Sequence, residues 1–111
     1  MKCVAHRVVV LIVLSLTISV TGCCDKDGVP KAIRSLNSEN ASERNKALLL
    51  LAKCSERAEP AVPRMIQLMY DQNVGVASSA AYALRSIDSQ RARAALKAAE
   101  AARAKSRGAR R

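Results

Sequence analysis

Residues 29–54 read VPKAIRSLNSENASERNKALLLLAKC, and residues 62–87 read VPRMIQLMYDQNVGVASSAAYALRSI. The two stretches align without a gap, 33 residues apart. Internal periods of roughly 20–50 residues are typical of proteins that stack copies of one supersecondary unit. The positions that coincide include Val29 with Val62, Pro30 with Pro63, Asn40 with Asn73, Ala47 with Ala80, and Leu51 with Leu84. We therefore interpret this part of the chain as two copies of one structural unit.

Each unit is predicted to contain two helices. The first helix, over 29–36 or 61–70, has apolar residues at amphipathic helical spacing and a proline in its opening turn. The second helix, over 41–55 or 74–87, has Asn40 or Asn73 as its N-cap, and Glu43 is placed to complete a capping box. The predicted core comprises Val29, Ala32, Ile33, Leu36, Ala47, Leu48, Leu51, Cys54, Val62, Met65, Ile66, Met69, Ala77, Ala80, Ala81, Leu84 and Ile87.

The two units resemble HEAT repeats, in particular the short HEAT-like units of phycobilisome lyases. The matching segments are Ala61-Val62-Pro63, Asp71 and Ala80-Ala81-Tyr82-Ala83-Leu84. The resemblance implies an all-α fold, a short right-handed α-solenoid of about two and a half helix pairs over residues 29–104. A third helix, predicted over 90–105 with Ala92, Ala95, Leu96 and Ala99 inward, has no partner helix and would form a polar terminal cap.

The chain departs from the HEAT-like pattern at two places. Arg44 occupies the family's arginine position in the first unit, but Ala77 replaces it in the second. Arg85 stands where the family has a glycine near the end of the second helix. We therefore expect the series of Asp–Arg contacts that links neighbouring repeats in the family to be incomplete here.

Residues 1–22 read as a targeting segment. Lys2 and Arg7 precede a run of 13 uncharged residues, 8–20, which is too short for a typical membrane-spanning helix. The following Val20-Thr21-Gly22-Cys23 resembles the lipobox of bacterial lipoproteins. That resemblance implies lipid attachment at Cys23, a tether over 23–28 and a periplasm-facing, membrane-anchored protein of the bacterial envelope, with the outer membrane favoured. An uncleaved anchor or a buried apolar segment are the alternatives.

The only histidine, His6, lies within the targeting segment. The remaining chain therefore has no Ser-His-Asp or Cys-His pair to activate a nucleophile, and it lacks the commonest transition-metal ligand. We expect no enzymatic activity, no metal and no cofactor, because a resemblance to lyases in fold does not imply their chemistry. Cys24 and Cys54 leave two interpretations open, a disulfide in an oxidising compartment or, as we favour, an unpaired Cys54 acting as a small apolar core residue.

The net charge of +10 is concentrated near the C-terminus. Residues 85–111 contain nine basic and two acidic residues, whereas residues 23–84 contain eight and seven. A disordered basic tail is predicted over 105–111, and anionic envelope polymers and lipid head groups are its candidate ligands. Nucleic acid is a less suitable ligand, because an exported protein does not meet cellular nucleic acid and because the chain has few aromatic residues for base stacking. The candidate tail residues are Arg103, Lys105, Arg107, Arg110 and Arg111. The alternative is a solvated tail that only maintains solubility.

One apolar residue in each second helix falls on the side opposite the core. These residues are Leu49 and, 33 residues later, Tyr82. Solenoids bind partners on such a surface, so we expect Leu49, Tyr82, Asn45, Lys53 and Arg85 to contact a protein or peptide partner. The alternative is that Leu49 and Tyr82 pack against neighbouring helices.

The sequence therefore predicts a non-enzymatic, lipid-anchored HEAT-like adaptor that binds a protein partner in the cell envelope. The alternative is a basic envelope protein whose C-terminal tail contacts peptidoglycan or lipopolysaccharide.

Overall fold

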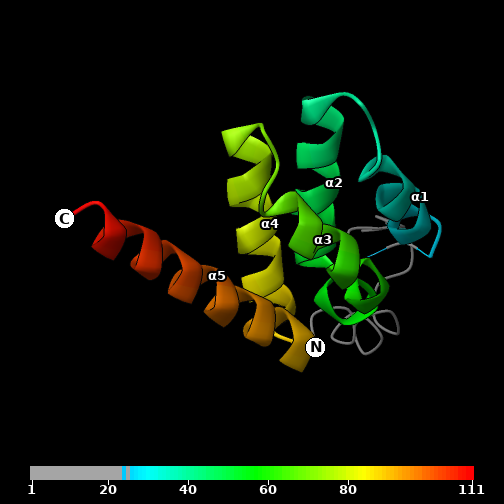
Figure 1. The fold of residues 1–111 in the computed structure, drawn as a ribbon. Coiled ribbons are helices and arrows are strands. Elements are labelled where there is room, and N and C mark those ends of the chain that lie inside the picture. The colour runs from blue at the N-terminus through cyan, green and yellow to red at the C-terminus, as the bar shows by residue number, and fades with distance from the viewer. Residues whose placement is uncertain (1–23, 25) are drawn as a thin grey trace, which may run out of the picture.

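The computed structural model describes Cys24 and residues 26–111, and this part of the chain contains five α-helices and no β-strand (Figure 1). The helices are α1 (Gly28–Ser35), α2 (Ala41–Lys53), α3 (Val62–Leu68), α4 (Val74–Ile87) and α5 (Gln90–Ala109). Two short 3-10 turns, η2 (Ser55–Arg57) and η3 (Glu59–Ala61), connect α2 to α3. The prediction of an all-α fold is confirmed. The predicted targeting segment and Cys23 lie outside the described residues.

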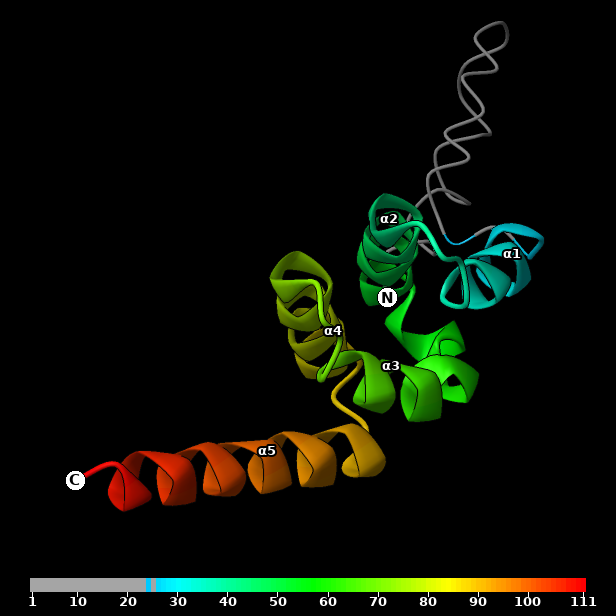
Figure 2. The same ribbon diagram turned by 45° about the horizontal axis from the view of Figure 1, so that its top comes forward.

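The two sequence copies form two helix pairs. Helix α1 packs on α2, α3 packs on α4, and the parallel helices α2 and α4 lie side by side along their lengths (Figures 1 and 2). The second helix of the first unit ends at Lys53 instead of residue 55, because the chain turns into η2 there. The first helix of the second unit spans Val62–Leu68 instead of 61–70, because Ala61 belongs to η3 and the two residues after Leu68 form a turn.

The N-caps of α2 and α4 have the same backbone geometry. Asn40 has φ −79° and ψ 115°, and Asn73 has φ −80° and ψ 114°. Their side-chain oxygens accept hydrogen bonds from the backbone N–H groups of Ser42 and Val76, at 2.9 and 3.1 Å. Both predicted caps are therefore confirmed. The predicted capping box is not formed, because Glu43 accepts from the Ser38 hydroxyl while the N–H of Asn40 donates to Ser38 Oγ.

The core lies between the two helix pairs and the start of α5. Most of the predicted core residues are buried, but Ile33, Ile66, Ala77 and Ile87 are only partly so. Leu68 is buried beside Met65, because α3 turns that side of the helix toward its neighbours. The largest fully buried side chains are Leu36, Leu48, Leu51, Val62, Met65, Val76 and Leu84.

A disulfide joins Cys24 to Cys54, with 5.3 Å between their Cα atoms. The favoured prediction of an unpaired Cys54 is wrong, although the side chain is buried as expected, at 5% exposure. The pairing arises because the end of α2 lies beside the segment that leads into α1, where Arg57 Nη1 donates to the carbonyl oxygen of Cys24 at 3.1 Å. A link across a separation of 30 residues stabilises the fold by about 3.5 kcal/mol in the chain-entropy treatment.

The C-terminal segment is helical almost to its end. Helix α5 continues to Ala109, so the prediction of a disordered tail over 105–111 is wrong for residues 105–109. Alanine, arginine and lysine are strong helix formers, and the glycine at 108 lies in the last turn, where few helical hydrogen bonds depend on it. The first half of α5 packs against α3 and α4, whereas its second half projects away from the other helices (Figures 1 and 2).

Candidate functional site

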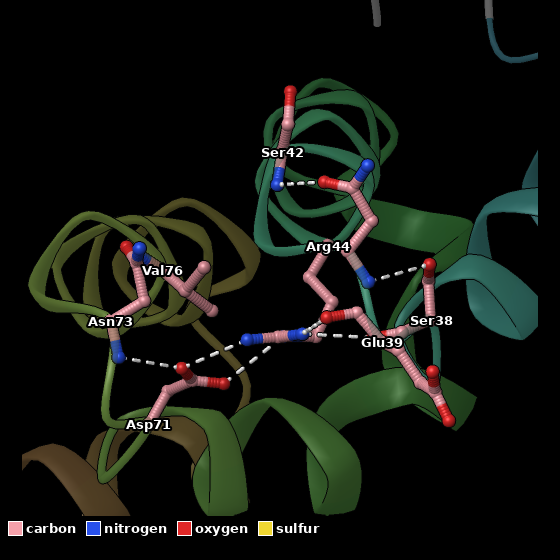
Figure 3. A network of polar contacts seen from close by, with 8 residues as sticks. Ser38, Glu39, Ser42, Arg44, Asp71, Asn73 and Val76 are labelled. Atoms are coloured by element: carbon pink, nitrogen blue, oxygen red, sulfur yellow. Dashed lines mark hydrogen bonds and ion pairs between the residues drawn. The ribbon is translucent and has the colours of Figure 1, made fainter.

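An arginine of the first unit binds an aspartate of the second. Arg44 on α2 donates from Nε and Nη2 to the two carboxylate oxygens of Asp71, both at 3.1 Å (Figure 3). Its Nη1 donates to the carbonyl oxygens of Ser38 and Glu39, at 2.8 and 2.9 Å. Arg44 therefore fastens the turn before α2 to the turn before α4. A two-point guanidinium–carboxylate contact of this kind fixes orientation as well as distance.

The ion pair is largely withdrawn from solvent. The side chains of Arg44 and Asp71 are only 14% and 10% exposed. The pKa of Asp71 is lowered from its ordinary value of 3.8, chiefly because the N–H of Asn73 donates to the carboxylate, and further because Arg44 binds it; burial acts in the opposite direction. Asp71 is therefore ionised at neutral pH, and its donors compensate for much of the cost of removing the charge from water.

The repeat places no second ion pair of this kind beside the first. Ser38 is equivalent to Asp71 and keeps the contact with the following N–H, that of Asn40, at 3.2 Å, but it carries no charge. Ala77 is equivalent to Arg44 and has no donor. Within residues 26–111, Arg44–Asp71 is therefore the ion pair that joins the two units. Each unit lacks the charged residue that a further neighbour would need.

The Asn45 side chain marks the line along which α2 and α4 meet. The hydroxyl of Ser79 on α4 donates to its Oδ1. Leu49 lies one helical turn after Asn45, and Tyr82 lies three residues after Ser79, so both follow this contact in the same direction along parallel helices (Figure 1). We call Asn45, Leu49, Lys53, Tyr82 and Arg85 the α2–α4 surface.

The two apolar members of the α2–α4 surface are exposed. Leu49 is 41% exposed and Tyr82 is 55% exposed, so neither is buried against a neighbouring helix. Lys53 and Arg85 are also exposed, whereas Asn45 is half-buried and bound to Ser79. The structure therefore brings Asn45, Leu49 and Tyr82 to the junction of the two helices, while Lys53 and Arg85 are one turn farther along their respective helices.

Leu50, which the sequence interpretation did not single out, is 42% exposed. The sequence feature that could have predicted this exposure is the run of four leucines at 48–51. A helix that packs on one side cannot turn four consecutive residues toward the core. Leu48 and Leu51 are fully buried, which leaves the two leucines between them facing outward.

A shallow groove lies between the C-terminal half of α5 and the end of α3. It is lined by Tyr70, Ala99, Ala102, Arg103, Ser106, Arg107 and Arg110. Three of the five candidate tail residues thus share one groove, whereas Lys105 and Arg111 do not line it. Sequence reasoning missed Tyr70 and Ser106, because a tail taken as disordered has no fixed side to turn toward α3.

Across Cys24 and 26–111, there is no group of three metal-ligating side chains of the His, Cys, Asp and Glu types. In the same part of the chain, none of the helices combines the length and apolar character that crossing a bilayer requires.

Comparison with known proteins gave no match to a family model, to a curated protein or to a solved structure.

Proposed function

We propose that this protein is a non-enzymatic adaptor in the bacterial cell envelope, anchored by lipid at Cys23, with a short right-handed HEAT-like solenoid that binds a protein partner. The observation that carries the partner-binding proposal is the exposure of Leu49 and Tyr82 on adjacent parallel helices. A large apolar side chain left in water at the same place in both units offers area that a partner can bury, at about 25 cal/mol per Å².

The solenoid arrangement is supported by the way the two units join. Helices α2 and α4 are parallel neighbours, and the Arg44–Asp71 pair holds them in one register. In solenoids each unit contacts only its neighbours, and successive second helices form a continuous binding surface. On this proposal α2 and α4 are that surface, and α5 is the first helix of a further unit.

The lipid anchor is supported by the sequence around Cys23 and by the disulfide that joins the next residue, Cys24, to the end of α2. Cys24 follows Cys23 directly and is linked to the end of α2 by the disulfide and by Arg57. An acylated Cys23 would therefore hold the helices close to the membrane, with little slack between lipid and fold. A disulfide also fits an oxidising compartment such as the periplasm.

The partner-binding proposal is tested by site-specific crosslinking in intact cells. A photoreactive phenylalanine analogue is placed at Leu49, at Tyr82 or, as a control, at Val74, which is 78% exposed and lies outside the α2–α4 surface. We expect the same discrete adduct from positions 49 and 82 and no such adduct from 74. A Leu49→Ser substitution should reduce the adduct at Tyr82 without lowering the Tm. Equal labelling from all three positions, or an adduct that Leu49→Ser leaves unchanged, would contradict the proposal.

The second candidate function is binding of an anionic envelope component through the C-terminal half of α5. The observation that favours it is the gathering of Arg103, Arg107 and Arg110 in one groove. Deleting residues 103–111 separates the two functions, because the adaptor should retain its crosslinked partner whereas the envelope binder should lose its ligand.

A further inference from the structure

One side of α5 changes character along the helix. Ala92 and Ala99 are buried on the side that packs against the other helices. Positions 99, 103, 106 and 110 follow one another at intervals of three or four residues, so they continue the same side of the helix. On that side the alanines give way to Arg103, Ser106 and Arg110, and Arg107 lies beside them. The basic side of the projecting half of α5 therefore faces the same way as its packed half.

The three arginines of the groove have no acidic partner. Within residues 26–111 the ion pairs are Arg44–Asp71 and Arg93–Asp88, and neither includes Arg103, Arg107 or Arg110. All the charged residues that line the groove are arginines. Arg103 and Arg107 are four residues apart on one helix, where like charges repel each other. An anion placed between them would remove that repulsion.

The donors in the groove suit a phosphate group. Each guanidinium presents parallel N–H groups that match two oxygens of a phosphate, and arginine is the preferred residue for this contact. Ser106 and Tyr70 add hydroxyl groups, and Tyr70, at 69% exposure, leaves its ring open to solvent at the end of α3. The two non-bridging oxygens of a lipid phosphodiester share one negative charge, and each can accept from more than one of these donors.

We propose that the groove formed by Tyr70, Arg103, Ser106, Arg107 and Arg110 binds the phosphate of an anionic lipid head group. The choice of a lipid over other phosphate-bearing ligands rests on the membrane anchor of the proposed function. An anionic bilayer surface attracts clustered arginines, and this attraction would add to that of the acyl chains. The second half of α5 would then lie against the head groups instead of projecting into solvent.

The test titrates the full-length chain in micelles of a non-ionic detergent. The chain has two tyrosines and no tryptophan, so a Tyr82→Phe background leaves Tyr70 as the fluorescent reporter inside the groove. The ligands are inorganic phosphate, dihexanoyl phosphatidylglycerol, dihexanoyl phosphatidylcholine and a single-stranded oligonucleotide. Isothermal titration calorimetry measures affinity, and Tyr70 fluorescence reports where the ligand binds.

Two double variants with the same change in net charge decide the outcome. Arg103→Gln with Arg107→Gln removes two groove residues, whereas Arg91→Gln with Lys97→Gln removes two exposed cations on other sides of α5. Glutamine preserves helix propensity, so both variants should keep the circular dichroism of the parent. We expect the groove variant to lose at least tenfold in affinity for phosphatidylglycerol and the control variant to lose less than threefold.

Phosphatidylglycerol should bind more tightly than phosphatidylcholine, and inorganic phosphate should compete with it. Equal losses in the two double variants would overturn the proposal, because they would show a response to net charge alone. If neither phosphatidylglycerol nor inorganic phosphate binds, the proposal is also overturned. If the oligonucleotide binds more tightly than phosphatidylglycerol, the assignment to lipid is overturned. The titration uses added short-chain lipid, so its result does not depend on acylation of Cys23 or on the partner of the α2–α4 surface.

Discussion

Arginine is used in two opposite ways, at the junction between the two units and in the projecting half of α5. Arg44 is 14% exposed, and its guanidinium donates to four oxygen atoms, two of Asp71 and two of backbone carbonyls. Arg103, Arg107 and Arg110 are exposed and have no acidic partner in the described chain. A basic residue thus contributes to the fold where acceptors surround it, and it is available to a ligand where they do not.

The largest expected effect is that of Arg44→Ala. The substitution leaves Asp71 nearly buried without its main cation and frees the carbonyl oxygens of Ser38 and Glu39. Because both side chains keep some contact with water, the loss should be smaller than for a fully buried pair, at about 2 kcal/mol. Denaturant unfolding followed by circular dichroism should show that loss. A cost below about 1 kcal/mol would mean that the pair does not hold the two units together.

The next effect is the pH dependence of stability contributed by Asp71. Its pKa is lowered in the folded state, so its stabilising contribution is fully present above the ordinary value of 3.8 and is lost as the pH falls through the lower, folded value. Because other carboxyl groups also titrate, the comparison is with Asp71→Asn, measured from pH 6 down to pH 2. The stability difference between the two proteins should shrink as acid is added, and a constant difference would show that the charge of Asp71 is immaterial.

The N-caps give a smaller effect and compare the two units with each other. Asn40→Ala and Asn73→Ala each remove one side-chain acceptor from a helix start of the same geometry. Each should cost about 1 kcal/mol. Thermal unfolding of the two variants should give closely similar losses. A loss confined to one of them would mean that the equivalence of the two units does not extend to their energetics.

The smallest expected effect on stability is that of Arg103→Gln with Arg107→Gln. Both residues are exposed and make no ion pair. The unfolding free energy should therefore change by no more than about 0.5 kcal/mol, with a correspondingly small shift in Tm. Differential scanning calorimetry measures this directly. A clear loss of stability would place these arginines among the residues that support the fold, and it would remove the contrast with Arg44.

Much of the fold could be predicted because the sequence states it twice. The 33-residue repeat located four helices, both asparagine caps and most of the core, since periodicity and capping act over short distances along the chain. The exposure of Leu49 and Tyr82 followed from the same helical spacing. The Asp–Arg series was expected to be incomplete because Ala77 has no side chain that could make a second pair.

The remaining features depend on contacts between distant residues. The disulfide requires the segment before α1 to meet the end of α2, and no local pattern around Cys24 or Cys54 encodes that meeting. The groove requires Tyr70 to face α5, which in turn requires α5 to be ordered beyond residue 105. The basic composition of the C-terminus suggested disorder, but the alanines between the charges favour helix.

The mass of the intact protein, extracted from bacterial membranes without reducing agent, tests whether this is an anchored and disulfide-closed adaptor. We expect a chain of residues 23–111 that carries acyl groups and is two hydrogens lighter than the form with free Cys24 and Cys54 thiols. A soluble product that keeps Met1, has no acyl groups and, after treatment with an alkylating agent, gains the mass of four alkylated thiols would contradict both the anchor and the closed disulfide, because Cys3 and Cys23 would be free beside Cys24 and Cys54.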